Sequence, residues 1–205
     1  MTGFRKESIK NAQLRQLIKI DDLKMAQYYF KAASCADDYF AALKLVQDVY
    51  TAEGYINADE ASSSYRILKN HFFEKTKVFI GKKNEKVIFT LSLFPDSSDG
   101  LPMDQIYKRE LDHLRSRGRT IGEVGCLATH PECRDGSHNL LMYGKKIMLK
   151  YAMEYFKLDD LVVTVHPKHA ELYKEAMMFD NLGESGIKSY PQVNSNPAVA
   201  LRLNL

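Results

Sequence analysis

A glutamate inside an apolar segment is the first candidate for chemistry. Glu123 lies between Ile121 and Val124 in residues 120–129, which are otherwise mainly apolar or small. Burying a carboxylate costs free energy unless the group is paired or has a function. Loss of solvent raises the pKa of a glutamate, and such a group can take a proton from an amine. The alternative is a structural role, in which Glu123 pairs with an Arg or Lys or faces solvent.

The loop after this segment is a candidate anion site. It contains Arg134, Gly136, Ser137 and His138, and a helix is expected to follow. The exposed N–H groups and the dipole at a helix N-terminus favour a phosphate there. An arginine and a glycine before a helix also occur in ordinary turns, so this second interpretation stays open.

A tyrosine follows the next apolar segment. Tyr173 comes after residues 161–165, which read as a strand buried on both faces, and after Pro167, which suits the first position of a helix. A tyrosine hydroxyl can donate a proton to a leaving group. The chain has 12 tyrosines, and a core position on an amphipathic helix explains Tyr173 equally well.

Four residues invite a zinc interpretation. Cys126, His130, Cys133 and His138 follow the pattern C-x3-H-x2-C-x4-H. This spacing matches no common structural zinc site, and Cys126 falls inside an expected strand. We therefore expect no metal at the site. The sequence also contains neither a G-x-S-x-G nucleophile motif nor a G-x-x-x-x-G-K phosphate loop.

Two lysines form a basic stripe on the helix expected at residues 137–156. Lys146 and Lys150 lie one helical turn apart. The simplest interpretation is the solvated face of an amphipathic helix. The alternative is a docking surface for an acidic carrier protein, because complementary charge accelerates encounter.

The elements that must position these residues mix strands with helices. In chain order we expect a strand at 25–33, a helix from a Ser34 cap to Gly54, a short helix at 62–73, a hairpin at 77–94, a helix from Pro102 to Arg117, strands at 120–129 and 161–165 joined by the helix, and a strand at 198–205. The β-α-β crossover favours a single mixed central sheet flanked by helices, an α/β or α+β fold.

Length and composition fit one globular domain. The 205 residues are 45% hydrophobic and 27% charged, and the net charge of +3 is too small to indicate nucleic-acid binding. We expect an N-terminal arm at 1–24 and one domain at 25–205. No apolar run approaches the roughly 20 residues of a membrane helix. The lack of a signal-peptide pattern and the three cysteines favour the cytoplasm.

Several blocks of sequence resemble a known family. Strand, anion-binding loop, helix, strand and tyrosine-bearing helix follow one another as in acyltransferases of the GNAT type. Longer blocks are similar to the long-chain N-acyl amino acid synthases: residues 90–93, 99–104, 110–115, 118–119 with Glu123, 165–173 and 193–203, and more weakly 45–50 and 54–56. The similarity covers roughly residues 25–205.

The resemblance implies a reaction. It implies a GNAT-like fold related to the N-acyl-homoserine-lactone synthases, and transfer of a fatty acyl group from acyl carrier protein to the amino group of an amino acid such as tyrosine. The acyl-phosphopantetheine of the carrier is then a co-substrate, and no tightly bound cofactor is expected. Gly125 and Cys126 stand where the lactone synthases have an arginine, which favours the amino acid branch.

The resemblance also implies roles for individual residues. Glu123 would assist deprotonation of the amine, Tyr173 would protonate the departing thiolate, and Lys146 and Lys150 would dock the carrier protein. Backbone N–H groups near Cys126 would stabilise the oxyanion. The acyl-phosphopantetheine arm is expected to contact Cys126, Leu127, Ala128, Thr129, Arg134, Gly136, Ser137, His138 and His166.

Two other functions remain open at this point. One is a coenzyme-A-dependent N-acetyltransferase of the same fold, and the other is a non-catalytic acyl- or lipid-binding module. Coenzyme-A-dependent GNAT enzymes resemble Arg/Gln-x-x-Gly-x-Gly/Ala in the anion loop, whereas this chain has Ser137 and Asn139 at the positions of the small residues. This departure disfavours a full coenzyme A cradle.

Overall fold

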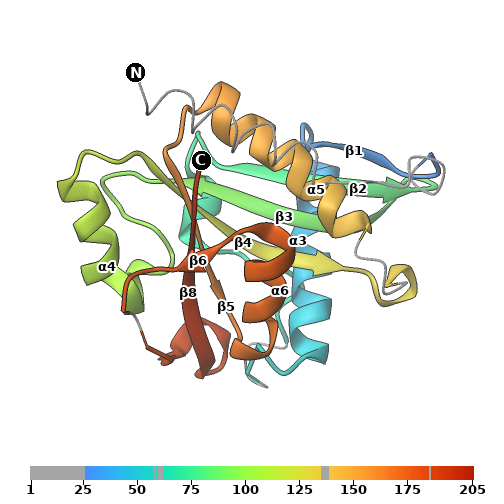
Figure 1. The fold of residues 1–205 in the computed structure, drawn as a ribbon. Helices are drawn as coiled ribbons and strands as arrows, with labels where there is room; N and C mark the ends of the chain where they lie inside the picture. The colour runs from blue at the N-terminus through green and yellow to red at the C-terminus, as the bar shows by residue number, and fades with distance from the viewer. Residues whose placement is uncertain (1–25, 58, 60–61, 135–138, 185) are drawn as a thin grey trace.

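Eight strands form one mixed sheet within the described part of the chain. The computed structural model describes residues 26–57, 59, 62–134, 139–184 and 186–205, so the expected arm at 1–24 lies outside it. The strands are β1 (Tyr29–Ala32), β2 (Lys77–Lys83), β3 (Lys86–Pro95), β4 (Ile121–Thr129), β5 (Asp160–Val165), β6 (Asp180–Asn181), β7 (Lys188–Tyr190) and β8 (Asn196–Asn204). Their order is β1-β2-β3-β4-β5-β8-β6, with β7 paired to β8 (Figure 1). The expected mixed central sheet is confirmed.

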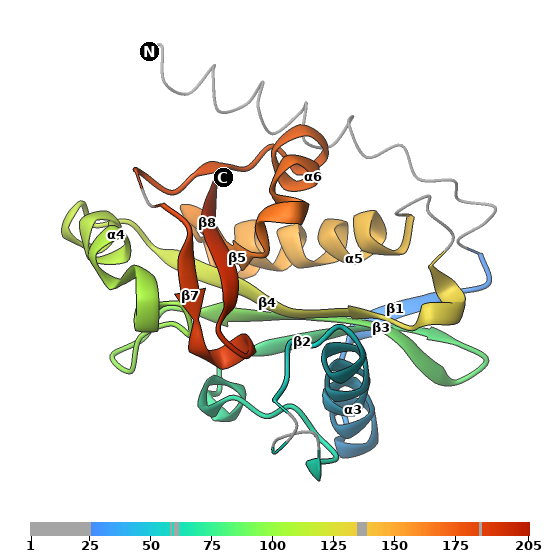
Figure 2. The ribbon, with the colours of Figure 1, turned by 90° about the horizontal axis from the view of Figure 1, so that it is seen from below.

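Helices cover both faces of this sheet. They are α3 (Ala36–Ala52), α4 (Asp104–Ser116), α5 (Asn139–Lys150) and α6 (Pro167–Met177). Side chains of α3 and α4 share one buried cluster, and those of α5 and α6 share another. Figure 2 shows α3 on one side of the sheet and α5 and α6 on the other. Within the described ranges, no helix has the length and apolar character needed to cross a bilayer.

The local signals near the hairpin and α3 are largely confirmed. Asn84 and Glu85 connect β2 to β3 with φ values of 49° and 63°, as a tight hairpin turn requires. Gly54 follows α3 with a φ of 72°, which suits a glycine at a helix end. The expected Ser34 cap is wrong, since Cys35 occupies the N-cap and makes no side-chain capping bond.

The expected helix at 62–73 is also wrong, because only a 3-10 turn forms at Lys69–Phe72. Buried polar side chains hold this segment instead. The Asn70 amide donates to the Gly100 carbonyl at 3.0 Å, and His71 Nδ1 accepts from the Leu68 N–H at 3.0 Å. These contacts satisfy the backbone outside a regular helix.

The parallel pair β4–β5 opens along its length. Its register runs from Ile121 opposite Asp160 only to Val124 opposite Val163, although both strands continue. On the other side of β4, the pairing with β3 shifts so that Cys126 and Leu127 together oppose a single residue. This β-bulge bends β4 away from β5. The two strands therefore splay, and the backbone of β4 beyond Val124 has no partner from β5.

A glycine lets α5 approach the sheet at the edge of this opening. A Cβ atom built on Gly144 would lie 2.2 Å from the Phe89 ring, so no larger residue fits without a shift. Close packing of α5 against β3 brings the first turn of the helix beside the splayed strands.

Candidate active site

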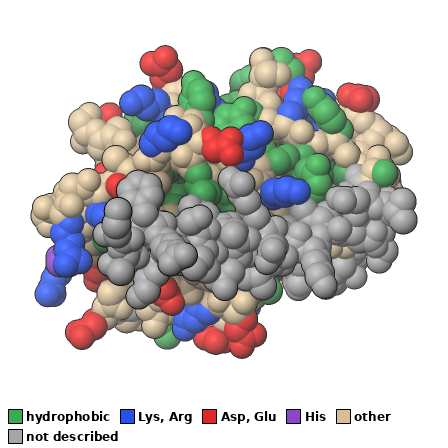
Figure 3. All heavy atoms as spheres, turned by 45° about the horizontal axis from the view of Figure 1, so that its top comes forward, with side chains coloured by type: hydrophobic (Ala, Val, Ile, Leu, Met, Phe, Trp, Pro, Cys, Tyr) green, Lys and Arg blue, Asp and Glu red, His purple; other side chains and the backbone are tan. Residues whose placement is uncertain are grey.

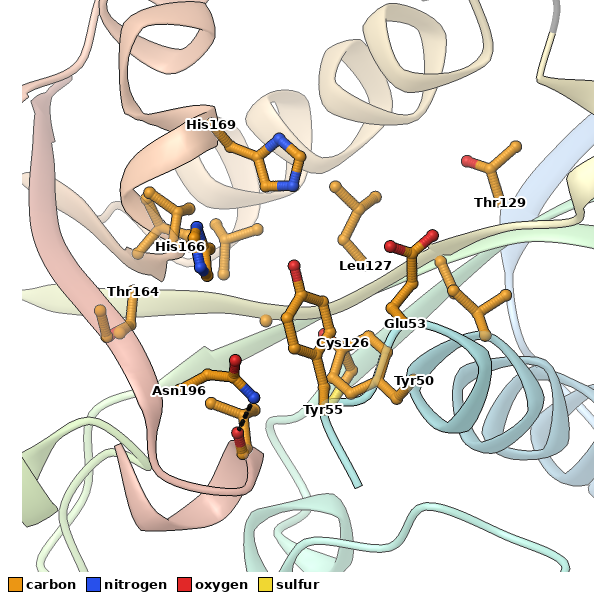
Figure 4. A pocket seen from close by; sticks show the side chains of 18 of the residues that line it. Tyr50, Glu53, Tyr55, Cys126, Leu127, Thr129, Thr164, His166, His169 and Asn196 are labelled. Atoms are coloured by element: carbon orange, nitrogen blue, oxygen red, sulfur yellow. Dashed lines mark hydrogen bonds between the residues drawn. The ribbon is translucent and has the colours of Figure 1, made fainter. Parts of the chain in front are cut away.

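The splay between β4 and β5 leads into a cavity of about 440 Å³. Glu123 and Tyr173 both line it. So do six residues expected to contact the acyl-phosphopantetheine arm: Cys126, Leu127, Ala128, Thr129, Arg134 and His166. Figure 4 shows several of these side chains around the cavity. The other expected contacts, Gly136, Ser137 and His138, lie outside the described residues.

Alternation along the strands gives the cavity two different walls. Cys126 belongs to the cluster on the α3 side, whereas Val124 and Leu127 belong to the α5–α6 side. The α5–α6 wall is apolar and contains Val124, Leu127, Leu140, Leu141, Val163 and Val165. Glu123 shares the face of Ile121, on the α3 side. The cavity therefore joins an apolar wall to a wall that bears a carboxylate.

Glu123 is a buried carboxylate whose oxygen accepts one backbone hydrogen bond. It is 4% exposed, and its Oε2 accepts from the Met103 N–H at 2.8 Å. Burial raises the pKa of Glu123 to about 8, although the Met103 hydrogen bond acts in the opposite direction. Among the described residues, no Lys or Arg forms an ion pair with it. Glu123 therefore neither faces solvent nor forms an ion pair with a described residue.

An ion-pair cluster outside the cavity fixes the loop that presents Met103. Arg115 bonds the carboxylates of Asp96 and Asp104, each through two contacts of 2.7–2.8 Å. Asp104 in turn accepts from the Leu101 N–H at 2.7 Å. Bidentate pairs of this kind set orientation as well as energy. They hold the Met103 N–H against Glu123.

The bulge in β4 gives the backbone an unusual conformation where the strand lines the cavity. Cys126 has a φ of 50°, in a region that residues other than glycine seldom adopt. Beyond Val124 the ladder offers no partner from β5, so N–H groups here are candidate oxyanion donors. Burial raises the pKa of the Cys126 thiol to about 12, and Glu123 adds to the shift. A protonated thiol is a poor nucleophile, so Cys126 is not set up for covalent catalysis.

Tyr173 and His166 reach the cavity from α6. Burial raises the pKa of Tyr173 to about 12, so its hydroxyl is protonated at neutral pH. Within the described residues this hydroxyl makes no hydrogen bond. His166 caps α6, and its Nδ1 accepts from the Lys168 N–H at 3.1 Å. A neutral His166 therefore carries its proton on Nε2, on the opposite side of the ring.

Arg134 lies at the mouth of the cavity. It forms an ion pair with Glu53 at 2.9 Å, and its Nε donates to the Thr129 carbonyl at 3.1 Å. Both side chains of the pair are more than a third exposed. The guanidinium is thus positioned beside the opening, as an anion site at that place requires.

Two further features of the sequence are the possible zinc ligands and the basic stripe of Lys146 and Lys150. Among the described residues, no group of three or more His, Cys, Asp or Glu side chains is arranged to hold a metal ion. Lys146 and Lys150 are both exposed on α5. Figure 3, a view of the side that carries α5, shows several Lys and Arg side chains among apolar ones.

Several cavity residues were not among the site residues expected from the sequence, although Tyr50 and Tyr55 lie in the weakly similar blocks. They are Tyr50, Tyr55, Arg66, Thr164, Tyr190 and Gln192. Figure 4 shows Tyr55 beside His166, and their ring centroids are 6.5 Å apart. Thr164 Oγ1 is buried without a hydrogen-bond partner in the described part of the chain. These residues come from separate segments, so no local spacing could have grouped them.

The fold, with its splayed strands, is the fold of the GNAT acyltransferases. Escherichia coli ElaA shares the fold with a TM-score of 0.59 and 10% identity, over 85% of this chain and 98% of that one. BjaI, a CoA-dependent acyl-homoserine lactone synthase, matches with a TM-score of 0.61 and 14% identity, over 86% and 83% of the two chains.

The comparisons also identify one family within this class. FeeM, an N-acyl amino acid synthase from uncultured soil microbes, matches with a TM-score of 0.73 and 25% identity, over 86% of this chain and 89% of that one. The family model "N-acyl amino acid synthase FeeM" matches residues 41–204. The chain belongs to this family and is an acyltransferase that transfers an acyl group to an amino acid. No curated protein matches it in sequence.

Proposed function

We propose that this protein transfers a long-chain fatty acyl group from the phosphopantetheine thioester of acyl carrier protein to the amine of an amino acid such as tyrosine. The observation that carries the proposal is Glu123, a buried carboxylate with a raised pKa in a cavity whose other wall is apolar. We place the reaction in the cytoplasm, where a carrier protein and reduced cysteines would both be found.

The amine is activated by Glu123 in this proposal. An amino acid amine is largely protonated at neutral pH, and only its neutral form attacks a carbonyl. A carboxylate with a pKa of about 8 accepts the proton more readily than an exposed glutamate does. The Met103 N–H holds the carboxylate in place while it acts.

The thioester is held between β4 and β5. The acyl-phosphopantetheine arm enters past Arg134 and His166, and the apolar wall receives the acyl side of the thioester. The amine nitrogen attacks the carbonyl carbon while backbone N–H groups at the Cys126 bulge stabilise the oxyanion. The C–S bond then breaks, the thiolate leaves, and the amide remains.

Tyr173 protonates the departing thiolate in this scheme. Its hydroxyl is protonated at neutral pH and lines the cavity. Because a thiol has an ordinary pKa near 8.5, the thiolate is a fair leaving group without help, and the effect of removing the proton donor is moderate. We expect Tyr173→Phe to lower kcat about 10-fold, measured by product formation with saturating donor and acceptor. An unchanged kcat would assign Tyr173 to packing against Phe179.

The carrier protein docks on α5 in this proposal. The first turn of α5 lines the cavity, and Lys146 and Lys150 are exposed farther along the same helix. Carrier proteins are acidic, so the charges are complementary. We expect Lys146→Glu with Lys150→Glu to raise KM for the acylated carrier about 10-fold or more and to leave kcat nearly unchanged. Lys108→Glu with Lys69→Glu, on other exposed segments, is the matched control. Equal KM values in the two double variants would exclude docking at α5.

One comparison of donors tests the proposal directly. Purified protein is given tyrosine with a palmitoyl carrier protein, with palmitoyl coenzyme A, or with acetyl coenzyme A. We expect the highest kcat/KM with the acylated carrier. The second candidate, a coenzyme A donor, has support from BjaI, which shares the fold and is CoA-dependent. A higher kcat/KM with either coenzyme A thioester would make coenzyme A, and not the carrier protein, the acyl donor.

A further inference from the structure

The wall of the cavity that bears Glu123 also carries a cation. Arg66 lines the same cavity, together with Tyr190 and Gln192. It lies in the segment between α3 and the 3-10 turn, where its backbone N–H donates to the Leu43 carbonyl at 3.1 Å. Its guanidinium donates to the Gln192 carbonyl, in the turn that precedes β8. The side chain is half-buried, so the charge is held at the cavity wall.

Two groups lie within electrostatic reach of both Arg66 and Glu123. Burial is the main cause of the raised pKa of the Tyr190 hydroxyl and of the Cys126 thiol. Glu123 adds to the shift in both cases, whereas Arg66 opposes it in both. The Tyr190 hydroxyl also bonds the Gln192 side chain at 3.1 Å. Arg66 and Glu123 therefore share one chamber, with Tyr190 and Cys126 near both.

Other basic side chains of the cavity occupy different positions. Among the described residues, Arg134 is the other arginine that lines the cavity, and no lysine lines it. Arg134 lies at the mouth, where it bonds Glu53 and the Thr129 carbonyl. His166 caps the N-terminus of α6, and His169 lies in the first turn of that helix. Arg66 is thus the arginine of the acceptor side.

We propose that Arg66 binds the α-carboxylate of the acceptor amino acid while the amine lies at Glu123. The inference rests on the proposed role of Glu123 as the base. A guanidinium has five N–H donors, so it can serve a protein carbonyl and a ligand carboxylate together. An α-amino acid carries its amine and its carboxylate on one carbon, which suits a chamber that holds a proton-accepting carboxyl group and a guanidinium. Arg66 is then the residue that selects amino acids over amines that lack a carboxylate.

The test compares an acceptor with and without its carboxylate. Purified wild-type protein and Arg66→Gln are each given tyrosine or tyramine with the same acyl donor. We expect Arg66→Gln to lower kcat/KM for tyrosine about 10- to 100-fold, mainly through KM, because a charge-assisted hydrogen bond is lost. The rate with tyramine changes less than about 3-fold. Arg66→Lys keeps the charge and recovers part of the activity with tyrosine.

Controls separate this role from folding and from the proposed function. Arg117→Gln removes an exposed arginine at the end of α4 and leaves both rates unchanged. Glu123→Gln lowers the rates with both acceptors. An equal loss with tyrosine and tyramine in Arg66→Gln would overturn the role of Arg66 and leave the reaction standing. A wild-type protein that acylates tyramine as efficiently as tyrosine would also overturn it, and one that acylates neither would overturn the proposed function as well.

Discussion

Replacing Glu123 with glutamine is expected to lower kcat about 10²- to 10⁴-fold, the usual contribution of a positioned general base. The amide of glutamine keeps the size of the side chain and can still accept from the Met103 N–H, but it cannot take a proton from the amine. The measurement is the rate of N-acyl amino acid formation at saturating substrates. A variant that keeps full activity while folded would exclude Glu123 as the base.

The pH dependence gives an independent check on the same residue. Because the pKa of Glu123 is about 8, its carboxylate fraction grows as pH rises toward that value. We expect the wild-type kcat to rise from pH 6, to reach half of its maximum near pH 8 and to level off about one pH unit above that, and the residual activity of Glu123→Gln to lack this dependence.

Stability should show the opposite trend with pH. The folded protein holds the proton of Glu123 up to a pKa of about 8, above the ordinary value of 4.5, so between these limits it binds more protons than the unfolded chain does. The stabilising contribution is complete below about pH 4.5 and is lost as pH rises through 8. In the wild-type protein the free energy of unfolding is therefore expected to fall as the pH rises from about 4.5 to about 8. In Glu123→Gln this contribution to the pH dependence is expected to be absent.

Replacing Asp160 with alanine is expected to destabilise the protein by about 3 kcal/mol, the effect of removing one member of a buried ion-pair group. Asp160 is fully buried at the start of β5, where its two oxygens bond Arg119 at 2.6 Å and Arg202 at 2.7 Å. These contacts join β5 to the residues before β4 and to β8, at the closed end of the splay. Their loss leaves two guanidinium groups facing each other.

Urea unfolding followed by circular dichroism measures this effect. The expected loss corresponds to a fall in Tm of about 10 °C for a chain of this length. Asp112→Ala is the matched control, because Asp112 forms exposed ion pairs with Lys108 and Arg115, and exposed pairs contribute little to stability. Equal stability losses in the two variants would contradict the role assigned to Asp160.

The sequence predicted the elements that carry local signals. Alternating and continuous apolar segments identified β4 and β5, and the turn chemistry at residues 83–85 identified the hairpin. Glu123 stood out because a carboxylate is unusual in a buried strand, and the structure shows it buried without an ion pair to the described residues. The crossover between β4 and β5 also followed from the order of elements.

The sequence could not predict which distant side chains meet. Arg66 and Tyr190 share the cavity although 124 positions separate them, and no local spacing encodes that contact. The positive φ at the bulge falls on Cys126 and not on the adjacent Gly125, so it was not foreseen. The helix expected at 62–73 failed because a tertiary hydrogen bond from Asn70 to the Gly100 carbonyl, and a local one from the Leu68 N–H to His71 Nδ1, override local propensity.

The central claim is that this protein makes N-acyl amino acids and uses Glu123 to do so. The most direct measurement is mass spectrometry of lipid extracts from cells that overexpress the wild-type chain, beside cells that express Glu123→Gln at the same level. We predict a set of N-acyl amino acids only with the wild-type chain, and their masses would identify the acceptor and the acyl length. The same lipids at equal amounts from both strains, or no such lipid from the wild-type strain, would contradict the account.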